Sequence, residues 1–270
     1  MRYISSLLKE YGLTAQFICY ELHKSYEINI TIPLKISPSP LAIDKPHNVC
    51  YNETMIATHV EQQKLIDFFH TGQMIKLGKN EYVVAPDEAP RGVFYIESGL
   101  VKSYDITKYG EENLLIVRKE GELIGLTWAI TGQAKSIINA ALCPTVVWRM
   151  PRERFIEFIR SNPDVAIPII DTLTNMYRLH SDRIMTLEYR TVKERLASFL
   201  LTTAARFGEK TSKGTLINSP LKQQDIASSI SATRETTSRS LAALQNNGII
   251  RIEQSIITIL DEDALNNIVS

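Results

Sequence analysis

A run of polar side chains near the C-terminal end of the chain, TRETTSR from Thr233 to Arg239, has the chemistry to read DNA. Arginine can donate two parallel hydrogen bonds to O6 and N7 of guanine, and glutamate can accept one from N4 of cytosine. Threonine and serine hydroxyls can contact phosphates, helped by the N-terminus of a helix. The alternative is a solvated helix end with two ordinary arginines. The candidate DNA-contacting residues are Thr233, Arg234, Glu235, Thr236, Ser238 and Arg239.

Two helices joined by a tight turn must position these side chains, and the segment 221–250 predicts both. Apolar residues recur at helical spacing in the first helix, and Ser231-Ala232 form the turn. The expected recognition helix, 234–246, follows a good N-cap residue and ends before a glycine. Two apolar runs, 249–252 and 256–260, then predict the paired strands of a wing.

This segment, TRETTSR followed by SLAALQNNGIIRIEQSIITILD, resembles the recognition helix and wing of the Crp/Fnr family of bacterial transcription factors. The resemblance covers about residues 55–270 and is most specific in the last third of the chain. It implies that Arg234, Glu235 and Arg239 read a half-site of the TGTGA kind, as in the cyclic-AMP-dependent members. Ser238 matches a base-contacting serine of the oxygen-sensing members. The implied partners are palindromic double-stranded DNA, a second copy of the chain, and RNA polymerase.

Short apolar runs separated by glycines fill the stretch from Met74 to Met150, which predicts an antiparallel barrel or jelly roll. The resemblance implies that this stretch is an effector-binding β-roll, similar to a cyclic-nucleotide-binding domain. The runs that look like strands are Tyr82–Val84, Val93–Ile96, Leu100–Val101, Leu114–Val117 and Thr145–Trp148.

The expected fold class is therefore α+β, with an N-terminal antiparallel β-roll, a long dimerisation helix and a C-terminal winged helix-turn-helix. No motif is found in residues 1–54, which are either a genuine extension of unknown role or the result of a start codon chosen too early. The expected domains are the extension 1–54, the effector-binding β-roll 55–162, the dimerisation helix and hinge 163–189, and the winged helix-turn-helix 190–270.

An apolar seam with alternating spacings of three and four residues predicts the dimerisation helix. The alternative is an amphipathic helix that packs on its own domain, and the resemblance favours the dimer. Pro168 predicts either a kink or a helix that begins near it. The expected hinge is Glu188–Arg190, and the next helix opens with a capping box at Thr191–Glu194, continues to about Phe207 and ends at Gly208. The seam residues are Ile170, Leu173, Tyr177, His180, Ile184 and Leu187.

The effector pocket departs from the family pattern. Cyclic-AMP-binding members hold the ribose with a glutamate and the phosphate with an arginine that precedes a serine. The turn Gly121–Gly125 places Leu126 at the ribose position, and Lys135 replaces the arginine before Ser136. Lysine lacks the planar fork of arginine, and leucine cannot accept a hydrogen bond from a ribose hydroxyl. We therefore expect a small organic anion rather than cyclic AMP, in a pocket lined by Leu126, Trp128, Lys135, Ser136, Tyr177 and His180.

Two alternatives to this pocket stay open. In the first, Glu122 is the ribose ligand and the protein responds to a cyclic nucleotide. In the second, the pocket is filled by its own side chains.

No cofactor is expected from the sequence. Cys19, Cys50 and Cys143 lack the paired spacing of zinc or iron–sulfur ligands, and no histidine for haem occurs between residues 71 and 179. The net charge is zero, with 30 basic and 30 acidic residues, so DNA binding must rest on specific contacts more than on a broad field. No signal peptide or apolar run of membrane-spanning length is found, so the expected location is the cytoplasm, with no membrane partner.

The motifs distinguish three classes of function. An effector-controlled regulator of transcription agrees best with the motifs. A sensory binding module without a DNA role would lack the winged helix at 221–260, and no catalytic set of an enzyme is found.

Overall fold

The computed structural model describes residues 56–134, 136–253 and 256–270, and all of them belong to one compact unit. The described residues do not include the proposed N-terminal extension, with Cys19 and Cys50, or Lys135. The tip of the wing at 254–255 lies outside them as well.

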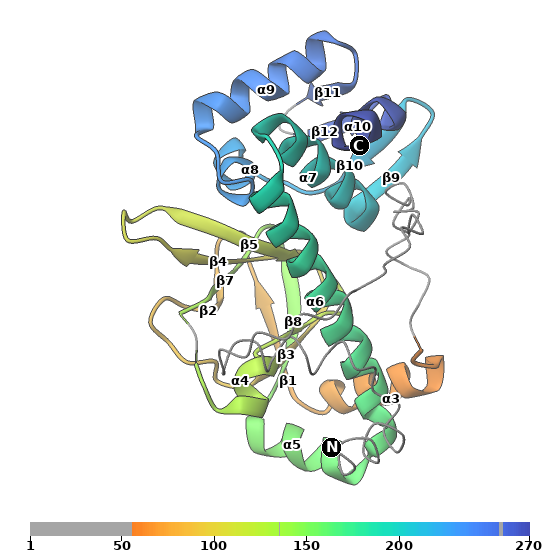
Figure 1. Cartoon of the computed structure of the whole chain (residues 1–270). Helices are drawn as coiled ribbons and strands as arrows, with labels where there is room; N and C mark the ends of the chain where they lie inside the picture. The colour runs from red at the N-terminus through yellow and green to blue at the C-terminus, as the bar shows by residue number, and fades with distance from the viewer. Residues whose placement is uncertain (1–55, 135, 254–255) are drawn as a thin grey trace, which may run out of the picture. The chain divides into compact units, whose positions relative to one another are not determined.

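Two four-stranded antiparallel sheets form the β-roll (Figure 1), as the glycine-punctuated apolar runs predicted. One sheet has the order β1-β8-β3-β6 and the other β2-β7-β4-β5. The sequence did not predict β1, β6 or β7. The strands are β1 Gln73–Leu77, β2 Tyr82–Val84, β3 Val93–Ser98, β4 Val101–Ile106, β5 Glu112–Arg118, β6 Leu123–Ile124, β7 Ile138–Ala141 and β8 Thr145–Met150.

The turn between β3 and β4 requires a glycine. Gly99 has a φ of +91°, and an added Cβ would meet Thr145 Oγ1 at 2.4 Å. Only glycine combines this left-handed conformation with so close a neighbour. The turn brings β4 into the second sheet, where it pairs with β5 and β7.

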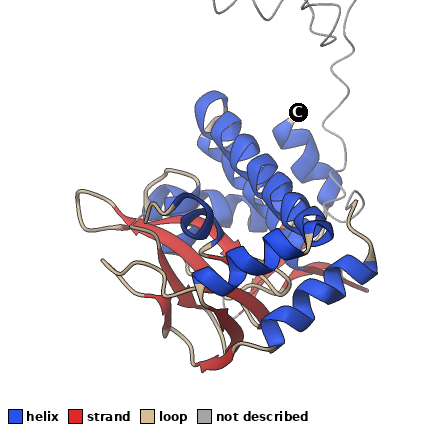
Figure 2. Ribbon diagram, turned by 90° about the horizontal axis from the view of Figure 1, so that it is seen from below, coloured by secondary structure: helices blue, strands red, loops and turns tan. Residues whose placement is uncertain are grey.

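Helices flank the strands of the roll, as Figure 2 shows in blue and red. An aromatic layer joins the first helix to the helix after the roll, because the Phe68 and Phe158 rings stack with centroids 3.8 Å apart. Phe69 and Phe155 are fully buried in the same cluster. The helices of this part are α3 His59–His70, α4 Leu126–Thr131, α5 Arg152–Ser161 and the short 3-10 turn η1 Pro163–Val165.

A long helix, α6 (Ala166–Tyr189), leads from the roll to the C-terminal domain. It begins two residues before Pro168. Of the two predictions for this proline, a kink or a helix that begins near it, the second is the one observed. The helix ends at the expected hinge, where Arg190 is extended. The predicted capping box then opens α7 (Val192–Phe207): the Glu194 amide donates to Thr191 Oγ1 at 3.4 Å, and the Thr191 amide donates to the Glu194 carboxylate at 2.7 Å.

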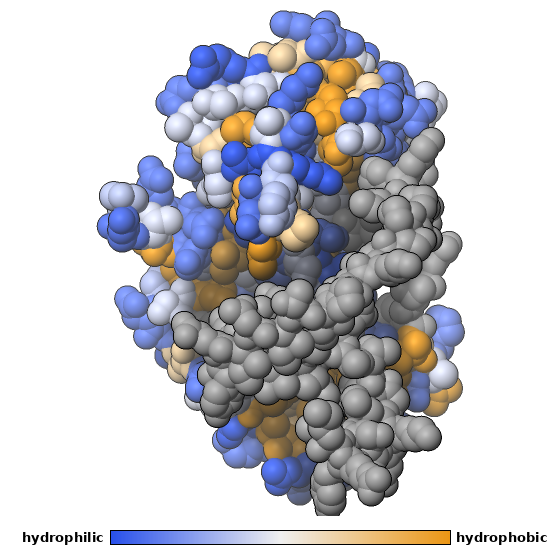
Figure 3. All heavy atoms as spheres, in the orientation of Figure 1, coloured by the Kyte–Doolittle hydropathy of each residue, from blue (hydrophilic) through white to orange (hydrophobic). Residues whose placement is uncertain are grey.

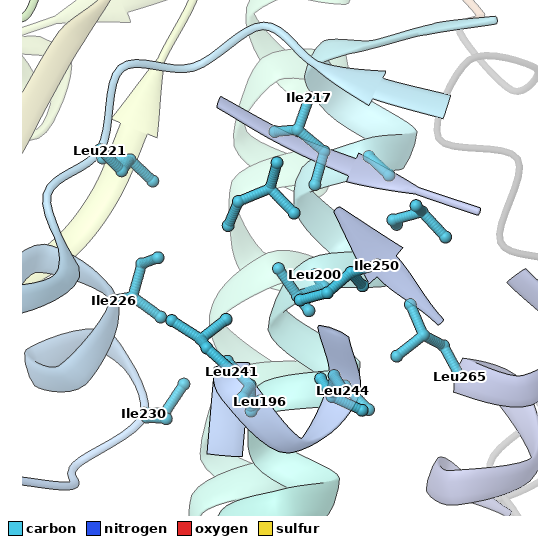
Figure 4. Packing of buried hydrophobic residues seen from close by; sticks show 14 of the residues in the cluster. Leu196, Leu200, Ile217, Leu221, Ile226, Ile230, Leu241, Leu244, Ile250 and Leu265 are labelled. Carbon is cyan, nitrogen blue, oxygen red and sulfur yellow. The ribbon is translucent and has the colours of Figure 1, made fainter. Parts of the chain in front are cut away.

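The C-terminal domain is a winged helix-turn-helix built on one apolar core. Leu196 and Leu200 of α7 pack against Leu241 and Leu244 of the recognition helix and against Leu265 (Figure 4). A four-stranded sheet, β11-β12-β10-β9, contains the expected wing, and β9, β10 and α10 were not predicted. The elements are β9 Gly208–Thr211, β10 Gly214–Ile217, α8 Gln223–Ser229, α9 Arg234–Asn246, β11 Ile250–Glu253, β12 Ile256–Ile259 and α10 Glu262–Val269.

The winged helix-turn-helix contacts the β-roll through α8 and β5. The backbone amide of Leu114 donates to Ser228 Oγ at 3.2 Å, and Leu114 belongs to the C-terminal apolar core. Lys102 of β4 is 8% exposed and lies 3.7 Å from the buried Asp225 carboxylate, while it also pairs with Glu112. Apolar and ionic contacts therefore join the two domains.

Candidate nucleic-acid interface and effector site

The recognition helix α9 has one buried face and one exposed face. Thr237, Leu241 and Leu244 are at most 2% exposed, which anchors the inner face in the core. Arg234, Glu235 and Arg239 are exposed on the outer side. In Figure 1, α8 lies between α9 and the β-roll, and the winged domain at the top of Figure 3 shows many hydrophilic residues. The six candidate DNA-contacting residues thus lie on one short helical segment and its cap.

The start of this helix is fixed by local hydrogen bonds. The backbone amide of Thr236 donates to Thr233 Oγ1 at 3.2 Å, which is the predicted N-cap. The Thr233 hydroxyl also contacts Thr236 Oγ1 at 3.0 Å, and Arg239 Nη2 lies 3.4 Å from the same oxygen. These contacts orient the polar residues before any DNA is present.

An arginine outside the motif holds the turn of the helix-turn-helix. Arg195 of α7 donates to the carbonyl of Ile230 at 2.9 Å, and Ser231 adopts a left-handed φ of +49°. Ala227 is fully buried, and its carbonyl accepts from the amide of Ala232 at 3.0 Å. Sequence reasoning missed Arg195, since its partners are backbone atoms 35 residues away in the chain.

The charged side chains on the outer face of α9 include both hydrogen-bond donors and a hydrogen-bond acceptor. Hydrogen bonding by its own backbone amide is the main cause that lowers the pKa of Glu235, and the positive charges of Arg234 and Arg239 add to it. Glu235 is therefore ionised at neutral pH and can only accept. The arginines can only donate. This is the complement that the edges of a G·C pair require.

Two known domains match most of the described chain. Residues 194–268 match the Crp-like helix-turn-helix domain, and residues 74–162 match the cyclic nucleotide-binding domain. The fumarate and nitrate reduction regulatory protein of Vibrio cholerae is 30% identical over 185 residues, which cover 68% of this chain and 73% of that protein. The chain belongs to the Crp/Fnr family.

A second regulator is similar in sequence, and a solved structure shares the fold. The electron transport regulator A of Shewanella oneidensis is 28% identical over 218 residues, covering 81% of this chain and 85% of that protein. The structure of FixK2 from Bradyrhizobium japonicum superposes with a TM-score of 0.65 at 23% identity, covering 74% of this chain and 98% of that one. The protein is thus a DNA-binding transcription regulator of the Crp/Fnr type.

The effector residues predicted for this Crp/Fnr regulator do not line one cavity among the described residues. Leu126 is the first residue of α4 and is 6% exposed, packed in the cluster that holds Phe69 and Phe155. Trp128 packs on the same cluster, with the Arg152 guanidinium 6.0 Å from its ring centroid. Because α4 turns both side chains toward the helical layer, they stabilise the roll instead of facing the cavity at Ser136.

Ser136 does border a cavity, of about 640 Å³, on the β-roll. The charged groups among its described lining residues are the carboxylates of Asp87 and Asp105, and one Asp105 oxygen is buried without a hydrogen-bond partner in the described structure. Lys135 lies outside the described residues, so its place relative to this cavity stays a prediction. Both described charged groups of this cavity are therefore acidic.

Tyr177 and His180 separate on the long helix α6. Tyr177 is 75% exposed on the outer side, whereas His180 lines a different cavity between α6, α7 and β5. Burial lowers the pKa of His180, and the nearby charges of Arg118, Arg183 and Arg206 lower it further. His180 is therefore neutral at neutral pH.

Glu122, the alternative ribose ligand, is engaged between the two domains. Arg206 of α7 donates to Glu122 Oε1 at 2.6 Å, and Arg118 Nη1 lies 3.9 Å from Oε2. The Arg206 and Glu122 side chains are 8% and 19% exposed, so this ion pair is largely withdrawn from water. Sequence reasoning missed the pair because its two members are 84 residues apart. A ribose hydroxyl at Glu122 would have to compete with a buried guanidinium.

The predicted dimer seam is only partly exposed. Ile170, Leu173, Tyr177 and Ile184 are between 41% and 75% exposed and form an apolar stripe along α6. His180 and Leu187 are half-buried at the edge of this stripe and also line the cavity between α6 and α7. Tyr189 and Met185, which sequence reasoning left out, are exposed apolar residues near the same end of α6.

Two observations concern metal binding and membrane spanning, and both apply to the described residues only. There, no three histidine, cysteine, aspartate or glutamate residues are grouped as metal ligands. Within the same residues, no helix is both long and apolar enough to cross a membrane.

Proposed function

We propose that this Crp/Fnr regulator acts as a homodimer on palindromic DNA, with one recognition helix α9 in the major groove of each half-site. The observation that carries the proposal is the outer face of α9, where Arg234, Glu235 and Arg239 are exposed while the inner face is fully packed. Arginine and glutamate at these positions suit guanine and cytosine edges, which favours half-sites of the TGTGA type.

The exposed stripe of α6 supports the dimer. Four apolar residues at 41% to 75% exposure on one helix face are costly in water, and a second copy of the helix would cover them. A two-fold axis along this stripe would place the two recognition helices about one DNA turn apart, ~34 Å.

Control by a small effector other than cyclic AMP completes the proposal. The β-roll belongs to a ligand-binding domain class, yet Leu126 is packed in the helical layer and Glu122 is paired with Arg206. Glu122, which could accept from a ribose hydroxyl, is therefore engaged in another contact, and Leu126 offers no acceptor. We further propose that the protein acts in the cytoplasm with RNA polymerase as a partner, without a haem or iron–sulfur centre.

Fluorescence anisotropy with a labelled palindrome of two TGTGA-type half-sites tests the DNA proposal. We expect binding at least about 1,000-fold tighter than to a scrambled duplex at the same salt concentration, since specific sites exceed non-specific DNA by this factor or more. Equal affinity for the two duplexes would contradict the assignment of α9 as a reader of bases.

A further inference from the structure

A second cavity lies where the β-roll, the long helix and the winged domain meet. It has a volume of about 110 Å³ and is bounded by β5, α6, α7, Leu221 before α8 and the C-terminal end of α8. Leu115, Leu179 and Phe199 supply apolar wall. We call it the junction cavity, and its walls come from both domains and the helix that connects them.

Three arginines line this cavity, and two of them, Arg183 and Arg195, have donors that are only partly engaged in the described structure. Arg183 donates from Nη1 to the carbonyl of Leu115 at 2.9 Å, and Arg195 donates to the carbonyl of Ile230 at 2.9 Å. The Nε atoms of Arg183 and Arg195 are buried without a hydrogen-bond partner among the described residues. A buried donor without a partner is destabilising, so a ligand that supplies an acceptor there would be favoured.

The balance of charge among the described residues that line the cavity is positive. Arg206 is its third arginine and is 8% exposed in its ion pair with Glu122. Among the described residues that line the cavity, Asp182 alone carries an acidic group. Burial is the main cause that lowers the pKa of His180. The positive charges of Arg118, Arg183 and Arg206 lower this pKa further, because they oppose another positive charge there. The surroundings already disfavour a cation and would favour an anion.

We propose that the junction cavity binds a small organic anion with an apolar body, held by the free donors of Arg183 and Arg195 and by the apolar wall of Leu179 and Phe199. No role for this cavity follows from the DNA-reading surface or from the β-roll. The junction cavity, at about 110 Å³, is smaller than the closed apolar cavity of about 150 Å³ that accepts benzene. It is open to solvent, because its lining residue Asp182 is exposed, so it suits a short alkyl chain or a partly enclosed ring that carries one carboxylate.

An occupant would couple the two domains. The anion contacts α6 and α7 on one side and β5 on the other, so it binds best to one arrangement of the winged domain against the roll. This consequence rests on the proposed function, because it requires that the winged domain binds DNA. The binding site itself doesn't depend on it.

Isothermal titration calorimetry of the whole chain, without DNA, tests the site with benzoate and hexanoate as probes. Their amides, benzamide and hexanamide, have the same shape without the charge. We expect at least one carboxylate to bind with a dissociation constant on the order of 1 mM or tighter, and its amide to bind at least about tenfold more weakly. Equal binding of acid and amide, or no binding of either acid up to about 10 mM, would overturn the proposal.

Two variants locate the binding. Arg183→Gln removes a positive charge and should weaken the carboxylate by at least about tenfold. Ser198→Leu fills the cavity from α7 without changing any charge and should abolish binding. Arg160→Gln, an exposed arginine on α5, is the matched control and should bind as the unaltered protein does. Circular dichroism and thermal unfolding verify that each variant folds, and unchanged binding in both cavity variants would place the anion elsewhere.

The effect of the anion on DNA affinity is measured in a separate experiment. The carboxylate that binds should change the affinity for the TGTGA-type palindrome in the unaltered protein, and Ser198→Leu should remove this change. Anion binding without any change in DNA affinity would overturn the coupling. A failure to bind DNA at all would instead count against the proposed function, since calorimetry is carried out in the absence of DNA.

Discussion

At the scale of residues, Arg234 is the side chain whose role can be tested most directly. It follows the N-cap Thr233, is exposed, and is the first residue of α9. Arg234→Ala should weaken binding to the palindrome by ~1–3 kcal/mol and relax the preference at one base pair, because a two-donor contact to guanine is lost. Anisotropy with the parent site and with single-base variants measures both effects.

The same titrations at several salt concentrations separate a base contact from a phosphate contact. Loss of a phosphate contact weakens all duplexes alike and lowers the salt slope by about one. If Arg234→Ala leaves the preference for the specific site unchanged and alters only the salt slope, Arg234 contacts phosphate. Arg160→Ala, far from α9 on α5, serves as the control and should change neither quantity.

The residue scale also shows where a local pattern stops being informative. Leu126 was predicted from the register of Gly121–Gly125 to sit at the ribose position, and it is the first residue of α4, buried at 6% exposure among apolar neighbours. A substitution Leu126→Glu would therefore bury a carboxylate in the helical layer, with a large desolvation cost. The register describes the position along the chain but not the direction in which the short helix turns its side chain.

At the scale of elements, the long helix α6 carries two faces with different tasks. One face exposes the apolar stripe that includes Leu173, and the other lines the junction cavity through Leu179 and Arg183. The spacing of three and four residues predicted four residues of the first face, whereas His180 and Leu187 of the predicted seam also line the cavity. The second face could not be predicted, because its partners on β5 and α7 are distant in the sequence.

The proposed dimer would be held by the exposed stripe of α6. Leu173→Lys should convert the dimer to monomers, because two lysines would face each other across the two-fold axis. Leu173 is 41% exposed in the protomer, so the fold of each chain should survive. Sedimentation velocity at micromolar concentration measures the state, and Ser161→Lys, which adds the same charge on α5, should remain dimeric. An unaltered protein that sediments as a monomer would contradict the proposed dimer.

At the scale of the whole molecule, the response to cyclic AMP distinguishes two hypotheses. In the first, the effector is not cyclic AMP; in the second, a cyclic nucleotide binds with Glu122 as its ribose ligand. Glu122 pairs with Arg206 across the two domains, so a nucleotide that used Glu122 would have to break a buried ion pair. We expect calorimetry of the unaltered protein to show no binding of cyclic AMP tighter than about 1 mM. The protein sample is validated by its binding to the palindrome.

A micromolar dissociation constant for cyclic AMP would reverse this conclusion. It would mean that Glu122 leaves Arg206 and serves as the ribose ligand. Glu122→Gln should then weaken the nucleotide, whereas Glu209→Gln, an exposed substitution on β9, should not.

Much of the architecture was determined by the sequence alone. Apolar runs with glycine turns gave strands β2, β3, β5 and β8, and the N-cap Thr233 with its apolar stripe placed α9 at residues 234–246, as observed. The capping box at Thr191 likewise fixed the start of α7. These signals are local, because hydrogen-bond capping and periodic burial depend on residues a few positions apart.

The tertiary structure alone decided which charges meet. Arg195 at the turn, Arg206 at Glu122 and Lys102 at Asp225 are all contacts between residues far apart in the chain. The two candidate cavities and the separation of Leu126 from His180 follow from the same packing. A single sequence contains no periodic signal for such pairs, since they arise only when the β-roll, α6 and the winged domain pack together and exclude water from the groups between them.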